Sequence, residues 1–239
     1  MRRTAITAAS LLATGLVATA CSASTPSNGA SPAAATSTGQ PGSAPNSPPA
    51  AAVKNLALTA ADFPAPYVYR ALPPGALEGA AGKVKGAVFD PPGCGASEVL
   101  PQGADPATTG VAIAVNSTTK ALLVATVAPV STSLTQLDSV VAQCAMFTVT
   151  VPAGPTARTS LTLLPPPQVN AEQARALRTT SMVTSGGSSK NTSFLSLRAE
   201  LKGVQVTVTG TPGTGGADVD PGLLDELLIK AVQKVNAGS

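Results

Sequence analysis

The sequence predicts an α+β domain: a mostly antiparallel sheet of about six to eight strands, two to three helices packed on one face, and one disulfide. Three observations predict this fold class. Short segments with alternating apolar residues recur between residues 67 and 209, glycine-rich and proline-rich turns separate them, and a long apolar helical stripe follows. We therefore expect one sheet covered by few helices.

The first part of the domain is predicted to contain a short helical turn and then strands. Thr59 is an N-cap candidate for a turn over residues 60–63. Extended segments follow at residues 67–72, 83–89, 111–115 and 121–127. The last two form a predicted hairpin, because only the short polar turn 116–120 separates them.

A helix is predicted in the middle of the domain. It begins at Thr132 or Ser133, and its apolar residues fall at helical spacing: Leu134, Leu137, Val141 and Ala145. Cys144 lies near the end of this helix, and residues 147–151 form the next predicted strand. A disulfide at Cys144 would therefore join the helix to a loop.

The second half of the domain is predicted to be rich in strands, at residues 159–164, 178–184, 193–201 and 204–209. Three prolines, residues 165–167, end the first of these strands. Residues 171–177 are interpreted as a short helix or a helix-to-strand transition. The clearest hairpin turns at Lys202 and Gly203.

The final helix carries the most complete set of helix signals. Asp220 is the N-cap candidate, and Pro221 occupies the favoured first helical position. One apolar stripe runs along it: Leu223, Leu224, Leu227, Leu228, Ala231, Val232 and Val235. We expect this stripe to close the core over the sheet.

The N-terminus is typical of an exported protein. Arg2 and Arg3 precede an apolar run, residues 5–20, which is shorter than the roughly 20 residues of a membrane-spanning helix. Residues 1–20 are therefore predicted to be a signal peptide. The small residues before Cys21 resemble a bacterial lipobox, whose cysteine thiol receives diacylglycerol and anchors the protein to the outer face of the cell membrane. The alternative is an ordinary signal peptide cleaved before an unmodified Cys21.

The chain then divides into a linker and a domain. Residues 22–52 contain only Ser, Ala, Thr, Pro, Asn, Gly and Gln, a composition that cannot bury enough surface to offset the entropy of ordering it. We interpret residues 21–52 as the lipidated cysteine with a disordered tether. Residues 53–239 form a single predicted globular domain.

Cys94 and Cys144 are predicted to form a disulfide, because an exported chain reaches an oxidising compartment and these two cysteines can satisfy each other. The chain contains no histidine, so two cysteines make a poor metal site. They also lack the C-x-x-C spacing of a redox pair. We therefore expect no metal and no cofactor.

Composition and charge exclude several function classes. Without Arg2 and Arg3 the chain keeps 13 basic against 12 acidic residues, and aromatic residues make up only 3%, which argues against nucleic-acid binding. The absence of histidine excludes Ser-His-Asp and Cys-His catalysis. We expect no catalytic residue and a protein that is not an enzyme.

Three features could suggest catalysis, and each has a simpler interpretation. Residues 117–120 fit S-x-x-K but lie between two predicted strands, so we interpret them as an exposed turn. Residues 210–216 lack the spacing of a phosphate-binding loop and are interpreted as a flexible connection. Nothing in the sequence pairs the scattered carboxylates Asp62, Glu78, Asp90 and Glu98, which we expect to be solvated.

Several stretches resemble actinobacterial, mycobacterial-type envelope lipoproteins that carry a domain of unknown function. These are Cys21 with its linker, LTAADFPAPYVY, a helix ending in a cysteine followed by FTVTV, LRAELKGVQVTVTG and PGLLDELLIKAVQKV. Their order is similar to the layout of the extracellular sensor domain of the mycobacterial serine/threonine kinase PknH. The resemblance implies an α+β binding or interaction module outside the cell membrane and assigns no functional residue.

Two functions follow as expectations. The first is a membrane-anchored, non-catalytic binding or sensor-like module that recognises an unknown ligand or protein of the cell envelope. The alternative is a lipid or glycolipid carrier, because many aliphatic and few aromatic residues can line an apolar cavity. A hydrolase is the remaining alternative.

Overall fold

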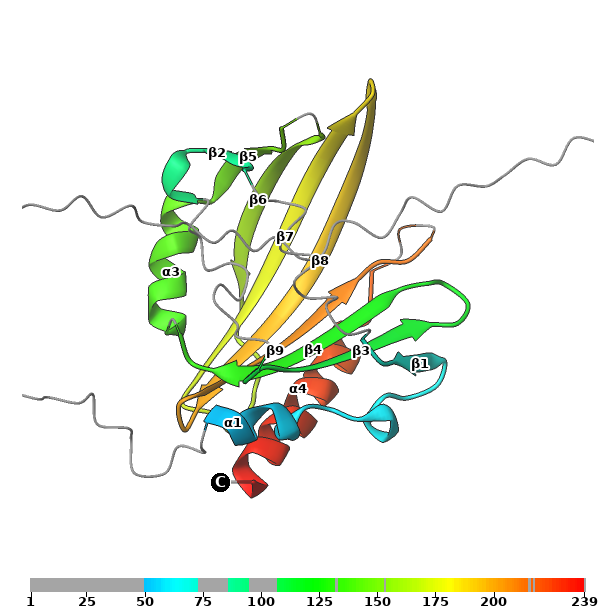
Figure 1. The fold of residues 1–239 in the computed structure, drawn as a ribbon, viewed down its shortest axis with the longest axis vertical. Helices are drawn as coiled ribbons and strands as arrows, with labels where there is room; N and C mark the ends of the chain where they lie inside the picture. The colour runs from blue at the N-terminus through cyan, green and yellow to red at the C-terminus, as the bar shows by residue number, and fades with distance from the viewer. Residues whose placement is uncertain are drawn as a thin grey trace, which may run out of the picture.

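The structure, a computed structural model, describes residues 50–72, 86–94, 107–131, 133–152, 154–214, 216 and 218–238. Within these residues the strands form one antiparallel sheet of nine strands in the order β1-β3-β4-β9-β8-β7-β6-β5-β2 (Figure 1). The strands are β1 (Tyr67–Arg70), β2 (Val88–Asp90), β3 (Gly110–Asn116), β4 (Leu122–Pro129), β5 (Met146–Thr150), β6 (Thr156–Leu164), β7 (Gln173–Ser185), β8 (Ser188–Leu201) and β9 (Val204–Thr211).

The α+β class and the antiparallel sheet are confirmed, but the expected six to eight strands are too few. Each of the nine strands overlaps one of the extended segments predicted from the sequence, so only the expected total was too low. The two edge strands are short, since β1 has 4 residues and β2 has 3. They belong to the sheet because they pair with β3 and β5.

The expectation that the helices pack on one face is wrong: α3 (Leu134–Gln143) and α4 (Pro221–Ala237) cover opposite faces of the sheet. Successive residues of a strand point to opposite faces. Ala176 of β7 packs in the core cluster of α4, whereas its neighbour Leu177 packs in the cluster of α3. An apolar helical stripe shows which side of a helix is buried, not which face of the sheet it covers.

Helix α4 forms the larger core cluster with the central strands. Leu224, Leu227 and Leu228 have no exposed surface, and they share this cluster with Val206 and Val208 of β9. The α4 side of the sheet therefore carries buried apolar residues of β3, β4, β8 and β9. The short N-terminal helix α1 (Ala50–Val53) adds to the same cluster.

Local signals at the start of α4 are confirmed. The Asp220 side chain accepts a hydrogen bond from the backbone N–H of Gly222 at 3.0 Å, and Pro221 is the first helical residue. Gly210 of β9 allows this end of α4 to approach the sheet, because a Cβ at Gly210 would lie 2.9 Å from the Cβ of Val219.

Helix α3 is also confirmed and begins at a capping box, but it ends at Gln143, so Ala145 of the expected stripe lies beyond the helix and is exposed. The Ser133 hydroxyl accepts from the backbone N–H of Gln136 at 3.3 Å, and the Gln136 side chain accepts in return from the Ser133 N–H at 3.0 Å. The buried residues are Leu134, Leu137 and Val141. A disulfide joins Cys144, at the C-cap, to Cys94, with their Cα atoms 5.6 Å apart. It ties the 3-10 turn Pro92–Cys94 to the helix.

Residues 171–177 are not helical, contrary to expectation, because β7 already begins at Gln173. This strand pairs with β8 over its whole length, from Gln173 opposite Glu200 to Ser185 opposite Ser188. The helix-forming residues of this segment therefore enter the sheet. A continuous ladder of backbone hydrogen bonds outweighs their intrinsic propensity, which is a weak determinant of structure.

The N-terminal segment is fastened to α4 by two lysines. Lys234 Nζ lies 2.6 Å from Asp62 Oδ2, and Lys230 Nζ donates to the backbone carbonyl of Asp62 at 3.1 Å. The backbone N–H of Thr59 also donates to Asp62 Oδ2, at 2.6 Å, which caps the 3-10 turn Ala60–Asp62 as the sequence predicted. Burial raises the pKa of Asp62, but hydrogen bonds from Lys234 and Thr59 outweigh it, so the pKa lies below its usual value of 3.8.

We predict that Leu227→Ala or Leu228→Ala lowers the free energy of unfolding by about 2–5 kcal/mol, because each change removes buried apolar surface and leaves a cavity. Chemical denaturation measures this directly. Glu226→Ala on the exposed side of the same helix is the control and should change stability by less than about 0.5 kcal/mol. A near-zero effect of both leucine variants would contradict the packing of α4 on the sheet.

We predict that Asp62 stabilises the fold in a pH-dependent way. Because its folded pKa lies below the unfolded value of 3.8, its contribution is complete above that value and is lost as the pH falls through the folded pKa. The melting temperature of the wild type should therefore exceed that of Asp62→Asn at neutral pH. The difference should shrink as the pH falls below about 4. A constant difference across this range would count against the ion pair.

Candidate binding groove

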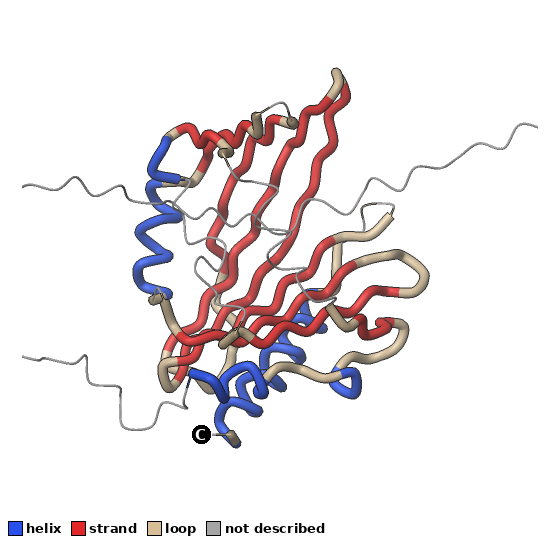
Figure 2. The backbone as a smooth tube through the Cα atoms, viewed as in Figure 1, coloured by secondary structure: helices blue, strands red, loops and turns tan. Residues whose placement is uncertain are grey.

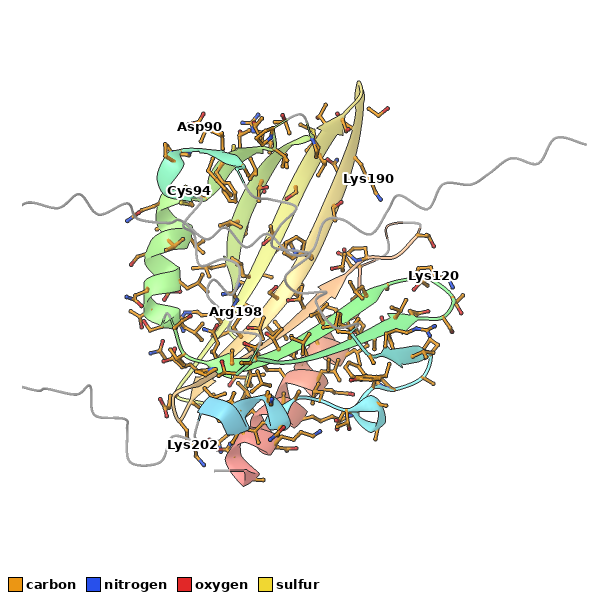
Figure 3. The ribbon with its side chains drawn as sticks, in the orientation of Figure 1. Asp90, Cys94, Lys120, Lys190, Arg198 and Lys202 are labelled. Carbon is orange, nitrogen blue, oxygen red and sulfur yellow. A yellow bond between two sulfur atoms is a disulfide. The ribbon has the colours of Figure 1, made fainter. Side chains whose placement is uncertain are left out.

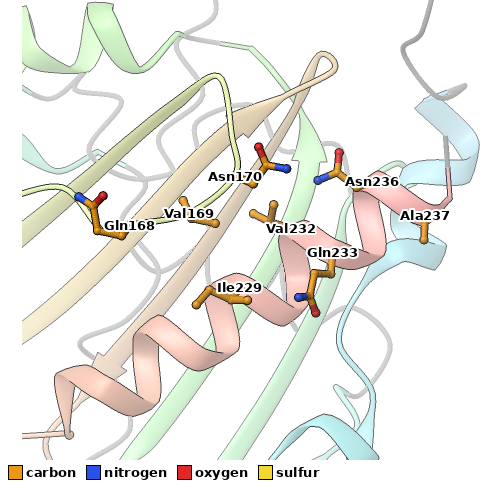
Figure 4. A pocket seen from close by; sticks show the side chains of 8 residues that line it. All are labelled: Gln168, Val169, Asn170, Ile229, Val232, Gln233, Asn236 and Ala237. Atoms are coloured by element: carbon orange, nitrogen blue, oxygen red, sulfur yellow. The ribbon is translucent and has the colours of Figure 1, made fainter.

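A groove of about 580 Å³ lies between the connection from β6 to β7 and the second half of α4 (Figure 4). Its lining residues are Gln168, Val169, Asn170, Ile229, Val232, Gln233, Asn236 and Ala237. This volume falls within the range of small-molecule sites, which is about 300–1,000 Å³. The groove opens at the surface, on the side of the sheet that α4 covers.

The helical side of the groove is one continuous stripe. The lining residues of α4 are spaced so that they share one side of the helix. They are Ile229, Val232, Gln233, Asn236 and Ala237. Val232 is 2% exposed and belongs to the core, whereas Ile229 is 38% exposed. The groove floor is therefore continuous with the hydrophobic core, and its edge reaches solvent.

The opposite wall is stiff and well braced. Prolines at 165–167 restrict the backbone before Gln168. The backbone N–H of Glu172 donates to the carbonyl of Glu200 at 2.9 Å, and the Glu172 side chain accepts from the Lys202 N–H at 2.8 Å. Lys202 Nζ in turn donates to the carbonyl oxygen of Asn236 at 3.3 Å. The β8–β9 turn thus ties both walls together, which preorganises the groove.

The chemistry of the lining is uncharged. Four side chains, those of Gln168, Asn170, Gln233 and Asn236, are carboxamides, and the others are aliphatic. Each carboxamide can both donate and accept hydrogen bonds. No lining residue carries an ionisable side chain. The groove can therefore bind neutral polar groups over an apolar floor, but its lining offers no general acid, general base or nucleophile.

A second polar cluster lies on the α3 face of the sheet, around Arg198 of β8 (Figure 3). Arg198 is 3% exposed, and burial lowers its pKa to about 10. Its neighbours across the strands are Arg175 and Thr207. Asp138 of α3 accepts hydrogen bonds from Arg175 Nε and Nη2 at 2.7 and 2.6 Å. Hydrogen bonding to this carboxylate raises the pKa of the Arg175 guanidinium above its usual value. This pair ties α3 to β7.

The residues singled out from the sequence do not converge on one site. Cys94 and Cys144 form the disulfide, whereas Cys21, Glu78 and Glu98 lie outside the described residues. Asp62 forms an ion pair with Lys234, and Asp90 is exposed in edge strand β2. The described carboxylates therefore stay apart.

The turn expected at residues 117–120 is confirmed, and the segment that follows β9 is hydrogen-bonded to it. Residues 117–120 form an exposed turn between β3 and β4, and Lys120 Nζ donates to the Ser117 carbonyl at 2.6 Å instead of activating its hydroxyl. Residues 210–214 continue from β9 into a loop, where the Thr214 N–H donates to the Thr119 carbonyl at 2.7 Å. The loop thus packs on the β3–β4 turn.

Neither the groove nor the polar cluster around Arg198 was predicted from the sequence. For the groove, the available signal was the second stripe of α4, which runs beside the apolar one and ends in Gln233 and Asn236. For Arg198, the available signal was its position between Leu197 and Ala199, which places it on the opposite face of the strand from these two residues. Residues that the structure describes contain no group of three His, Cys, Asp or Glu side chains placed to hold a metal ion. Among these residues, no helix is both long and apolar enough to cross a membrane.

Comparisons with known proteins give a family and a similar solved structure. An X-ray structure of an uncharacterized protein from Mycobacterium smegmatis, the Rv0999 ortholog, is similar with 17% identity and a TM-score of 0.45, over 80% of this chain and 98% of that chain. No curated protein matches the sequence. Residues 49–236 match the family described as a domain of unknown function, DUF5642. Because this match spans most of the chain, the protein belongs to the DUF5642 family.

Proposed function

We propose that the protein is an exported lipoprotein, anchored at the outer face of the cell membrane through diacylglycerol on Cys21, whose domain is a non-catalytic binding module. The ligand is an uncharged molecule of the cell envelope that carries both hydrogen-bond donors and acceptors, such as a neutral glycan or a peptide-like amide. The tether before the domain gives it reach from the membrane surface without a fixed orientation.

The observation that carries this proposal is the lining of the groove. Four carboxamides surround an apolar floor, and no lining side chain is ionisable. A charged ligand would lose its hydration without gaining a counter-charge, whereas a neutral polar ligand can exchange water for the carboxamides. The braced walls reduce the entropy lost on binding.

The same observations favour the binding module over the two alternatives. A lipid carrier needs an enclosed apolar volume, but the leucines of α4 fill the space against the central strands, and the groove has a polar rim. A hydrolase needs a nucleophile or a titratable pair, and the groove lining contains neither.

For the anchor, we predict that Cys21→Ala moves the protein from the membrane fraction to the soluble exported fraction, because the acylated thiol is lost. Ser22→Ala, which leaves the thiol in place, should remain with the membrane. Fractionation of the host cells followed by immunoblotting measures both variants. Continued membrane retention of Cys21→Ala would overturn the lipid anchor.

For the groove, we predict that the protein purified from its own host retains an uncharged polar molecule, detected by native mass spectrometry. The double variant Asn170→Ala/Gln233→Ala should weaken its binding about 5- to 150-fold, since each lost hydrogen bond is worth about 0.5–1.5 kcal/mol. Gln143→Ala, an exposed carboxamide on α3, is the matched control and should bind normally. Retention of an apolar lipid that the double variant does not release would instead support the carrier.

A further inference from the structure

The hairpin of β7 and β8 extends beyond its neighbours on one side (Figures 1 and 2). Strand β6 pairs with β7 as far as Thr156 opposite Thr184, near the tip. On the other side, β9 pairs with β8 only from Leu195 opposite Gly210 onward. In the described chain, residues 188–194 of β8 therefore have a strand partner on the β7 side alone. We call these seven residues the open edge of β8.

The turn at the tip determines which backbone groups face this open edge. Gly186 and Gly187 form a two-residue turn with φ values of 57° and 81°, and Ser185 pairs with Ser188 across it. In such hairpins the flanking pair is hydrogen-bonded, and hydrogen-bonded pairs then alternate along the ladder. Ser188, Lys190, Thr192 and Phe194 therefore direct their N–H and C=O groups to β7. Ser189, Asn191 and Ser193 direct theirs outward.

The open edge carries little protection against strand pairing. Native edges are usually short, bulged, or guarded by proline and by several charges. Both ends of the sheet follow this rule, since β1 has 4 residues and β2 has 3. The open edge contains no proline, and Lys190 is its one charged residue. Ser189, Lys190 and Asn191 are exposed, so another strand can reach these backbone groups.

We propose that the open edge of β8 is an interface with a second copy of this chain, in which two such edges pair antiparallel about a two-fold axis at Asn191. The pairing joins the two sheets into one continuous sheet. It goes beyond the proposed ligand binding and does not depend on it, because none of the residues that line the groove belongs to the open edge.

The match of donors, acceptors and charge argues for this partner and this register. With Asn191 opposite Asn191, Ser189 faces Ser193, so all three outward-facing residues meet outward-facing residues. Lys190 then lies opposite Thr192, and the two lysines stay apart. A register centred on Lys190 would place two like charges directly opposite each other, and one centred on Thr192 would leave Ser189 unused. The sequence of the open edge is thus self-complementary in one register.

The first test is the mass of the full chain carrying Cys21→Ala, measured by analytical ultracentrifugation over a range of concentrations. We expect a dimer, with twice the monomer mass. Asn191→Pro removes an outward N–H without removing a bond to β7, and Asn191→Glu places two carboxylates opposite each other. Both should give monomers with unchanged circular dichroism. A wild-type monomer at every concentration overturns the proposal, as does a dimer that both variants leave intact.

The second test is disulfide trapping in the same background. In a hydrogen-bonded antiparallel pair the opposing Cα atoms lie about 5.5 Å apart, which suits a disulfide, so Asn191→Cys should give a covalent dimer under mild oxidation. Met182→Cys is the matched control: this exposed residue lies opposite Asn191 on β7, one strand further from the interface, and should remain monomeric. Equal trapping at both positions, or none at Asn191→Cys, overturns the register.

Discussion

The packing of α4 on the central strands is the interaction on which the rest of the structure depends. Its buried leucines meet valines of β9 that have no exposed surface, so this contact fixes where the C-terminal helix lies on the sheet. That position places one side of α4 against the β6–β7 connection and forms the groove. It also places Lys230 and Lys234 where they hold Asp62 and the N-terminal segment. One apolar contact therefore positions a candidate site and a structural clamp.

Local chemistry made the helices and hairpins predictable from the sequence. The Asp220 cap, Pro221 and the leucine stripe give α4, and the Ser133 capping box gives α3. Positive φ values at Lys202 and Gly203 accompany the predicted β8–β9 turn. Each of these signals depends on residues within a few positions of one another, so a sequence without coordinates already contains them.

The sheet faces and the candidate site could not be predicted, because they depend on contacts between distant residues. Ala176 and Leu177 are both apolar neighbours in β7, and the sequence does not show which of them faces α4 and which faces α3. Arg198 alternates with apolar residues as an outward-facing residue would, but it is buried because β8 lies in the middle of a sheet that α3 and α4 cover on opposite faces. The groove likewise joins residues 168–170 to residues 229–237, which no local pattern connects.

The two ends of the described chain lie at the same end of the molecule, and the tip of the β7–β8 hairpin lies at the other (Figure 1). Gly238 packs against Leu56, so closely that a Cβ there would lie 2.5 Å from Leu56 Cδ2. Polypeptides can be fused or rejoined where termini adjoin at a surface. The fold is thus suited to circular permutation, with a short bridge between residues 50 and 238 and new ends opened at Gly186 and Gly187. A cargo fused after Gly238 would stand beside α1 and leave the far end of the sheet uncovered.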